Sequence, residues 1–179
     1  MLARLQQFTT LGGLAVALLW GWVCWEAGSP AWGVAGAAFV VGGHALVLGL
    51  EFVLLRRAHG DDPTPRATPA QLFRAWWGEV RAAPRVFCWR QPFRSRQWPD
   101  HLPSEARGRR GLLLVHGYVC NRGLWNPWLK RLHEQGVPFV AVDLEPVFGS
   151  IDDYIALLEQ AVQRLERCTG LAPVIVAHS

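Results

Sequence analysis

The chain has 179 residues, of which 51% are hydrophobic and only 18% charged, and its formal net charge is +4. The apolar residues concentrate in positions 1–55, which leaves roughly 120 residues and room for one modest soluble domain. The four cysteines, at positions 24, 88, 120 and 168, show neither CxxC spacing nor a partnering histidine pattern. We therefore expect reduced thiols rather than a metal site or a disulfide framework, and no cofactor.

Residues 1–57 contain two long apolar runs separated by a tight turn. Thr9 to Trp25 is a run of roughly 17 residues and Ala31 to Leu50 one of roughly 20, each long enough to cross a bilayer. Tryptophans cluster around the turn at Glu26–Pro30, as in the aromatic belt of a membrane protein. The first run lacks an Ala-x-Ala site, which favours a membrane helix over a cleaved signal peptide. We expect residues 1–57 to form a transmembrane helical hairpin.

The flanking cations predict how this hairpin is oriented. Arg4 precedes the first run, Arg56 and Arg57 follow the second, and the turn between the runs carries no cation. The positive-inside rule then places both ends in the cytoplasm. We expect a multi-pass protein of a bacterial inner membrane with a cytoplasmic soluble domain. His44 and Glu51 share a helix face, and an interfacial Glu is favoured over a buried functional pair.

Residues 58–108 are predicted to hold a juxtamembrane linker, an amphipathic helix and strands leading into a sheet. Asp61–Pro69 contains three prolines and is the linker. Thr68–Gln71 supplies the N-cap, proline and capping-box residues of a helix start. The helix that follows has an apolar face suited either to the membrane interface or to packing on the soluble domain. Basic and aromatic residues mix in 85–96, which indicates a strand pair near anionic lipid headgroups rather than nucleic-acid binding.

Residues 109–179 alternate between strand-like and helix-like segments. Segments 121–136 and 150–170 are amphipathic, with Asn and Ser as N-caps and Gly as the stop. Short apolar runs typical of buried parallel strands lie around and between them. The three runs are Leu112–Val115, Pro138–Leu144 and Val174–Ala177. This order predicts an α/β fold with a βαβαβ unit and a mostly parallel sheet flanked by helices.

Residues able to support chemistry follow the first and last of these runs. The first leads into His116-Gly117-Tyr118, and the last continues as Ala177-His178-Ser179. A serine in a tight turn after a buried strand requires a small residue two positions before it, which Ala177 provides. A His-Gly turn presents the backbone N–H of the next residue, Tyr118, as a donor to an oxyanion.

In these residues and their order the chain resembles the α/β-hydrolase superfamily, and most closely its lipase and esterase branch. The resemblance covers Arg109 to Ser179, the N-terminal part of such a domain, and Ala-His-Ser in place of Gly-x-Ser is a variant seen in some bacterial lipases. It implies acyl-ester hydrolysis by a Ser-His-acid triad, with Ser179 as nucleophile, Ala177 and His178 in the nucleophile elbow, and the Tyr118 N–H as oxyanion donor.

The same resemblance also implies what this stretch lacks. The triad acid and histidine follow the nucleophile in that family, so neither maps onto this chain, and His116 and Gly117 only support the oxyanion turn. We therefore expect the chain to be an inactive fragment of an intact enzyme. The substrate of that enzyme is expected to be an ester, including lipid esters because of the membrane anchor. The sequence does not predict an oligomeric state.

Two alternatives remain beside this interpretation. One is a non-catalytic membrane protein, either transporter-associated or a scaffold, that carries a hydrolase-like domain; a continuation without a triad histidine would favour it. The other is a relative of the epoxide hydrolases or dehalogenases. Those enzymes carry Asp at the nucleophile position, so Ser179 disfavours this second alternative.

Reporter fusions test the predicted orientation. A reporter joined after Arg66 should score as cytoplasmic, because the flanking arginines resist translocation. A reporter placed within Glu26–Pro30 should score as exported, with both signals normalised to the amount of fusion protein. An exported signal from the fusion after Arg66 would contradict this topology.

Overall fold

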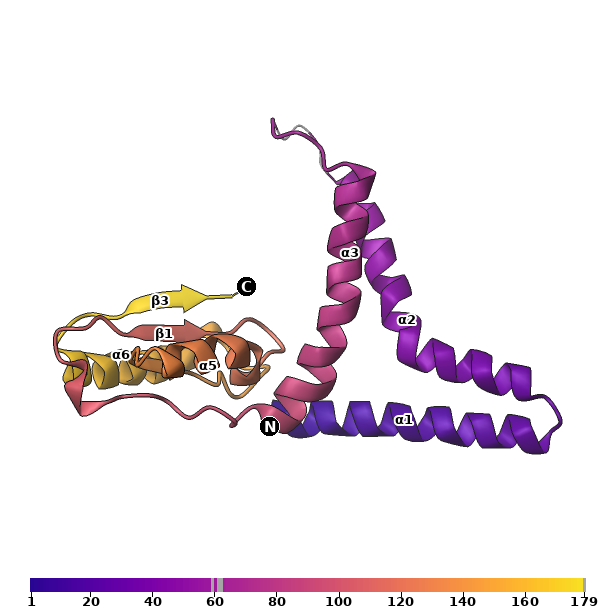
Figure 1. The fold of residues 1–179 in the computed structure, drawn as a ribbon, viewed down its shortest axis with the longest axis horizontal. Coiled ribbons are helices and arrows are strands. Elements are labelled where there is room, and N and C mark those ends of the chain that lie inside the picture. The colour runs from indigo at the N-terminus through magenta and orange to yellow at the C-terminus, as the bar shows by residue number, and fades with distance from the viewer. Residues whose placement is uncertain (59, 61–62, 179) are drawn as a thin grey trace. The chain divides into compact units, whose positions relative to one another are not determined.

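The computed structural model describes residues 1–58, 60 and 63–178 as a mixed α/β protein (Figure 1). Two compact units make up the chain: Phe8–Arg85, and Met1–Gln7 together with Val86–Ser179. The first unit is helical, and the second contains a parallel sheet. Part of the predicted linker, and the predicted nucleophile Ser179, lie outside the described residues.

Two long apolar helices dominate the first unit. α1 spans Leu2–Glu26 and α2 spans Pro30–Arg57, with 25 and 28 residues, and each is long and apolar enough to cross a membrane. At about 1.5 Å per residue, both exceed the roughly 30 Å of a bilayer's hydrocarbon core. Almost none of their most apolar stretches is buried, unlike the core helix of a soluble protein. The two predicted apolar helices are therefore present, and each is longer than its predicted run.

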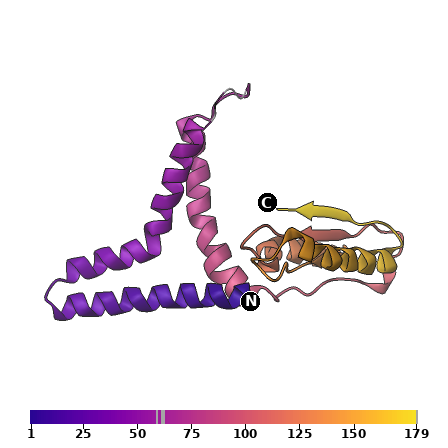
Figure 2. The same ribbon diagram turned by 180° about the vertical axis from the view of Figure 1, so that it is seen from behind.

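α1 and the first part of α2 lie side by side and run in opposite directions (Figures 1 and 2). Gly28 lies in the turn between them with a φ of +70°, a conformation that glycine adopts without steric cost. The Trp20 indole N–H donates a hydrogen bond of 2.9 Å to the Trp32 carbonyl and ties the two helices together. A Cβ added to Gly36 would collide with the Trp20 ring, so this close approach requires glycine.

The helix predicted after the linker is α3, Pro69–Ala83, and its capping box is confirmed. The Thr68 side chain accepts from the Gln71 N–H, and the Gln71 side chain accepts from the Thr68 N–H. α3 packs along the second part of α2 (Figure 2). The Trp76 indole N–H donates to the Ala45 carbonyl at 2.9 Å, and His44 Nε2 lies 3.1 Å from the Val80 carbonyl oxygen. The partner of α3 within its unit is therefore α2.

A three-stranded parallel sheet organises the second unit. β1 (Leu112–Val115) lies between β2 (Phe139–Ala141) and β3 (Val174–Ala177), in the order β2-β1-β3. The predicted parallel α/β arrangement is thus present, although β2 is shorter than the run predicted for it. α5 (Asn126–Glu134) follows β1 and α6 (Ile155–Thr169) follows β2.

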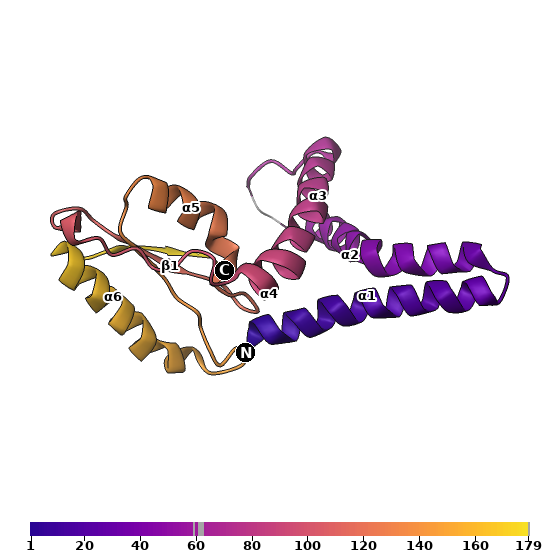
Figure 3. The same cartoon turned by 60° about the horizontal axis from the view of Figure 1, so that its bottom comes forward.

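The two helices cover opposite faces of this sheet (Figure 3). Neighbouring residues of β1 separate accordingly, because successive strand side chains point to opposite faces. Leu113 packs in a cluster with Leu165 of α6, whereas Leu114 packs with Leu129 of α5. All four side chains are fully buried. β1 is therefore the centre of the core on both faces.

Residues 85–96 do not form the predicted strand pair; that prediction was wrong. The segment is helical, with a π-helix at Pro84–Arg90 followed by α4 at Gln91–Arg94. Its last carbonyl groups are satisfied by side chains far along the chain. The Asn121 amide donates to the Gln91 carbonyl at 3.0 Å and the Asn126 amide to the Arg94 carbonyl at 2.9 Å. These tertiary contacts stabilise a helix end that the local pattern does not predict.

The other helix boundaries follow the predicted local signals. Asn121 caps a short 3₁₀ turn, Arg122–Trp125, that leads into α5. Ser150 forms a capping box with Asp153 at the start of the segment leading into α6. Gly136 and Gly170 end the two helices with φ values of +61° and +74°, the left-handed conformation that favours glycine.

β3 has apolar side chains that the described residues leave exposed. Val174 is 43% and Ile175 59% exposed, whereas their partners on β1 are largely or fully buried. An open groove of about 700 Å³ runs along this part of the sheet beside α6. Exposed apolar strands of this kind promote edge-to-edge association.

We expect Ile175→Lys to reduce self-association of the purified chain in detergent. The substitution places a charge on an exposed strand, so the free energy of unfolding should change by only about 0.5 kcal/mol. The matched variant Leu113→Lys, which puts the same charge into the core, should unfold the sheet unit. Light scattering and a denaturant midpoint measure the two effects. Unchanged self-association of a folded Ile175→Lys protein would show that this strand is not the contact.

Candidate functional site

The carboxyl ends of β1 and β3 meet at one edge of the sheet. Val115 pairs with Ala177, and the His178 N–H donates to the Val115 carbonyl at 2.9 Å. Because the two strands are parallel neighbours, the turn after β1 and the residues after β3 emerge together. The structure thus brings His116, Gly117 and Tyr118 to the same edge as Ala177 and His178.

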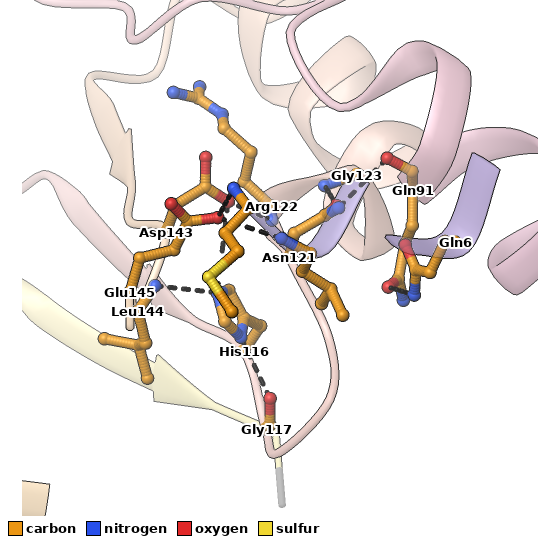
Figure 4. Close-up of polar contacts among 12 residues, drawn as sticks. Gln6, Gln91, His116, Gly117, Asn121, Arg122, Gly123, Asp143, Leu144 and Glu145 are labelled. Carbon is orange, nitrogen blue, oxygen red and sulfur yellow. Dashed lines mark hydrogen bonds and ion pairs between the residues drawn. The ribbon is translucent and has the colours of Figure 1, made fainter. Parts of the chain in front are cut away.

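His116 connects the ends of β1 and β2 (Figure 4). Its Nε2 accepts the Leu144 N–H at 3.0 Å, so the ring proton sits on Nδ1, which donates to the Gly117 carbonyl at 2.9 Å. Burial lowers the pKa of His116, although the Gly117 carbonyl and the carboxylates of Asp143 and Glu145 act in the opposite direction. His116 is therefore a neutral, fully hydrogen-bonded bridge rather than a free base.

The turn after His116 has a strained backbone. Val119 adopts a φ of +54°, a left-handed conformation that is a rare outlier for a β-branched residue and costs about 1–3 kcal/mol. The Tyr118 side chain is largely exposed. Among the described residues the Tyr118 backbone N–H has no hydrogen-bond acceptor. The turn therefore presents an unused donor beside the end of β3.

Buried amides hold the strained turn in place. The Asn121 side chain accepts the Gly123 N–H at 2.9 Å while its amide donates to the Gln91 carbonyl. Gln91 is completely buried, and its side-chain oxygen accepts from the Gln6 amide at 2.7 Å. A Cβ on Gly123 would lie 2.8 Å from the Arg90 carbonyl oxygen. The N-terminal residues, α4 and the β1–α5 turn therefore form one hydrogen-bonded support.

A charged network lies on the β2 side of this support. The Asp143 carboxylate accepts the Arg122 N–H at 2.8 Å. The Arg122 guanidinium pairs with Asp100 at 3.0 Å, and Asp100 also pairs with Arg164 at 2.9 Å. Asp143, which follows β2, thus fixes the turn after β1, and its carboxylate also lies 4.0 Å from His116 Nε2. Motif spacing does not predict Gln91, Asn121, Asp100 or Arg122 as supporting residues, because each acts through a distant partner.

Cys120 follows the strained Val119 and is the nearest thiol to the turn. The residue is buried, and burial raises the pKa of the Cys120 thiol more than the nearby Gln91 side chain lowers it. The thiol is therefore protonated at neutral pH and unsuited to be a nucleophile.

An apolar cavity of about 500 Å³ opens beside the turn. Its walls combine the turn with the β2–α6 connection and the start of α6. The lining includes Val115, Tyr118, Leu144, Val147, Ile155 and Leu158. A cavity with this lining suits an acyl chain or another apolar group.

Neither metal clusters nor known relatives add to this geometry. Within residues 1–58, 60 and 63–178, no group of three or more His, Cys, Asp or Glu side chains could hold a metal ion. Comparisons with protein-family models, with curated proteins and with solved structures found no match. The site is therefore defined by its own residues.

The lowered pKa of His116 predicts acid sensitivity. The unfolded chain binds a proton near pH 6.5 while the folded chain resists it, so this contribution to stability is present above that pH and is lost as the pH falls below it. His116→Gln keeps an acceptor for the Leu144 N–H but cannot titrate. Its free energy of unfolding, measured with denaturant in detergent, should fall less steeply than that of the wild type between pH 7 and about pH 5.

A second histidine, His101, also affects how the free energy of unfolding changes with pH. Burial and His133 also lower the pKa of His101, so a residual acid sensitivity should remain in His116→Gln. His101→Gln should remove this residual part and leave the contribution of His116 in place. Equal slopes for His116→Gln and the wild type would contradict the prediction.

Proposed function

We propose that this chain carries the oxyanion turn and the nucleophile of a membrane-anchored serine hydrolase that cleaves acyl esters. The observation that carries the proposal is the pairing of β1 with β3. Through it the His116-Gly117-Tyr118 turn adjoins His178, the residue directly before Ser179 in the sequence. A donor turn beside the strand that precedes a serine is the arrangement required for acyl transfer.

In the proposed reaction the Ser179 hydroxyl attacks the ester carbonyl carbon. A histidine takes its proton, the alcohol leaves as the acyl-enzyme forms, and water then releases the acid. The Tyr118 N–H and the N–H following Ser179 stabilise the tetrahedral oxyanion. We assign the histidine and its acid to residues after Ser179, because both follow the nucleophile in the hydrolases that the chain resembles. The Nε2 of His116 is already occupied by the Leu144 N–H.

The backbone strain supports a catalytic role over the non-catalytic alternative. Val119 adopts a left-handed conformation next to a residue, Asn121, that buried hydrogen bonds fix in place, and such strain concentrates at functional sites. A scaffold domain gains nothing from a strained turn with an unused N–H donor. The strain and the free donor together therefore favour the hydrolase.

Two features support a lipid-like ester as the substrate. The apolar cavity beside Tyr118 suits an acyl group. The two long apolar helices, which we propose cross the membrane with both ends in the cytoplasm, would keep the site close to lipid. The cavity and the membrane attachment therefore both favour a lipid-like ester.

Two Tyr118 variants, made in the protein expressed from its complete coding sequence, test the proposal. Tyr118→Pro removes the N–H donor and should lower kcat for a p-nitrophenyl ester by about a hundredfold or more. Tyr118→Phe removes only the phenol and should keep most activity. Circular dichroism must show both variants folded, because proline also restrains the turn.

Ser179→Ala is the companion variant and should abolish turnover. Three outcomes would contradict the proposal: full activity in Ser179→Ala, complete loss in a folded Tyr118→Phe protein, or a coding sequence without a histidine after Ser179. The first outcome would show that Ser179 is not the nucleophile. The second would show that the phenol of Tyr118, and not its backbone N–H, is essential. The third would leave the proposed reaction without its base.

A further inference from the structure

A groove separate from the ester site lies between the end of α2 and the start of α3. It belongs entirely to the helical unit and has a volume of about 740 Å³. Its wall is apolar and aromatic, and its rim is cationic. The wall includes Phe52, Val53, Leu72, Phe73 and Trp76, and the rim consists of Arg56, Arg57 and Arg66.

The apolar wall is held by specific contacts. The Trp76 indole is fixed by its hydrogen bond to the Ala45 carbonyl, and the Phe73 ring packs against it with centroids 5.5 Å apart. Gly49 faces this indole with no side chain of its own; a Cβ there would lie 3.5 Å from Trp76 Nε1. The groove is therefore a built feature of the α2–α3 contact.

Among the described residues, the cationic rim has no paired carboxylate. Arg56 and Arg57 form the last turn of α2, and Arg66 precedes the capping box of α3. All three are exposed, and none is ion-paired with a carboxylate among the described residues. Three guanidinium groups around one opening repel each other, and a bound anion would relieve that repulsion.

We infer that this groove binds an anionic phospholipid. The phosphate is held by the arginines of the rim, and an acyl chain lies against Phe52, Leu72 and Trp76. Basic pockets between apolar helices recognise lipid headgroups in this way. A free phosphate would leave the apolar wall unused, so charge and lining together select a lipid. The inference rests on the proposed membrane placement of α1 and α2 and is independent of ester hydrolysis.

Native mass spectrometry of the full chain tests this site. The chain is released from nanodiscs of phosphatidylcholine with a minor share of phosphatidylglycerol, and we expect one phosphatidylglycerol retained per chain. The triple variant Arg56→Gln, Arg57→Gln, Arg66→Gln should reduce retention at least about tenfold. The charge-matched control Arg74→Gln, Arg81→Gln, Arg85→Gln, outside the groove, should retain it. Equal loss in both triples would overturn the site in favour of general electrostatic attraction.

Two further arms separate the lipid from its headgroup. Val53→Trp fills the groove but keeps the arginines, and it should also lower retention. Inorganic phosphate in excess should not displace the lipid; displacement would show an anion site alone and overturn the inference. Recovery of the wild-type chain in the aqueous phase, without nanodiscs, would overturn the membrane placement and this site with it. None of these readouts depends on ester hydrolysis, so lipid binding and ester hydrolysis are tested separately.

Discussion

The parallel pairing of β1 with both of its neighbours is the constraint on which the sheet unit depends. β1 is the central strand, and Leu113 and Leu114 anchor the cores on its two faces. Parallel strands align their carboxyl ends, so this single register places the turn after β1 beside the end of β3. The candidate site is therefore a consequence of how the core is built.

The same edge carries backbone strain that the surrounding structure sustains. Val119 is unfavourable by itself, and one local hydrogen bond, from the Cys120 N–H to the Gly117 carbonyl, closes the turn around it. Distant contacts fix the two sides of the turn: His116 joins the ends of β1 and β2, and Asn121 joins the turn to Gln91 of α4. Because these groups are buried and hydrogen-bonded, the loss of any one partner would leave another polar group unsatisfied. The turn and its support therefore behave as one unit.

The helical unit differs from the sheet unit because it exposes much apolar surface and has few polar contacts. Its large apolar side chains are mostly exposed, so water is a poor environment for this surface. Indole and imidazole groups supply the directional contacts between helices, as with Trp20 to Trp32 and Trp76 to Ala45. Three arginines, Arg56, Arg57 and Arg66, gather beside the groove between the end of α2 and the start of α3. The apolar helices thus suit the hydrocarbon core of a bilayer, and the arginines of the rim suit its headgroups.

Features that depend on neighbouring residues could be predicted from the sequence. The capping box at Thr68, the N-cap at Ser150, the stop at Gly170 and the apolar helices follow from local chemistry, and the structure contains all of them. The His-Gly-Tyr turn was also identifiable, because short-range spacing marks it. The helix at Pro84–Arg94 could not be predicted from local sequence. Its last carbonyls accept hydrogen bonds from the side chains of Asn121 and Asn126, which lie 30 and 32 residues further along the chain.

The support of the candidate site was likewise decided only by the tertiary structure. Gln91 is an ordinary polar residue in the sequence, and it becomes essential only when folding buries it against Gln6 and Asn121. The neutral state of His116 depends on burial and on the Leu144 N–H, which the segment after β2 supplies. Spacing encodes which residue types stand near each other along the chain. Packing decides which of them lose water and must find a partner, and that loss is what gives these side chains their roles.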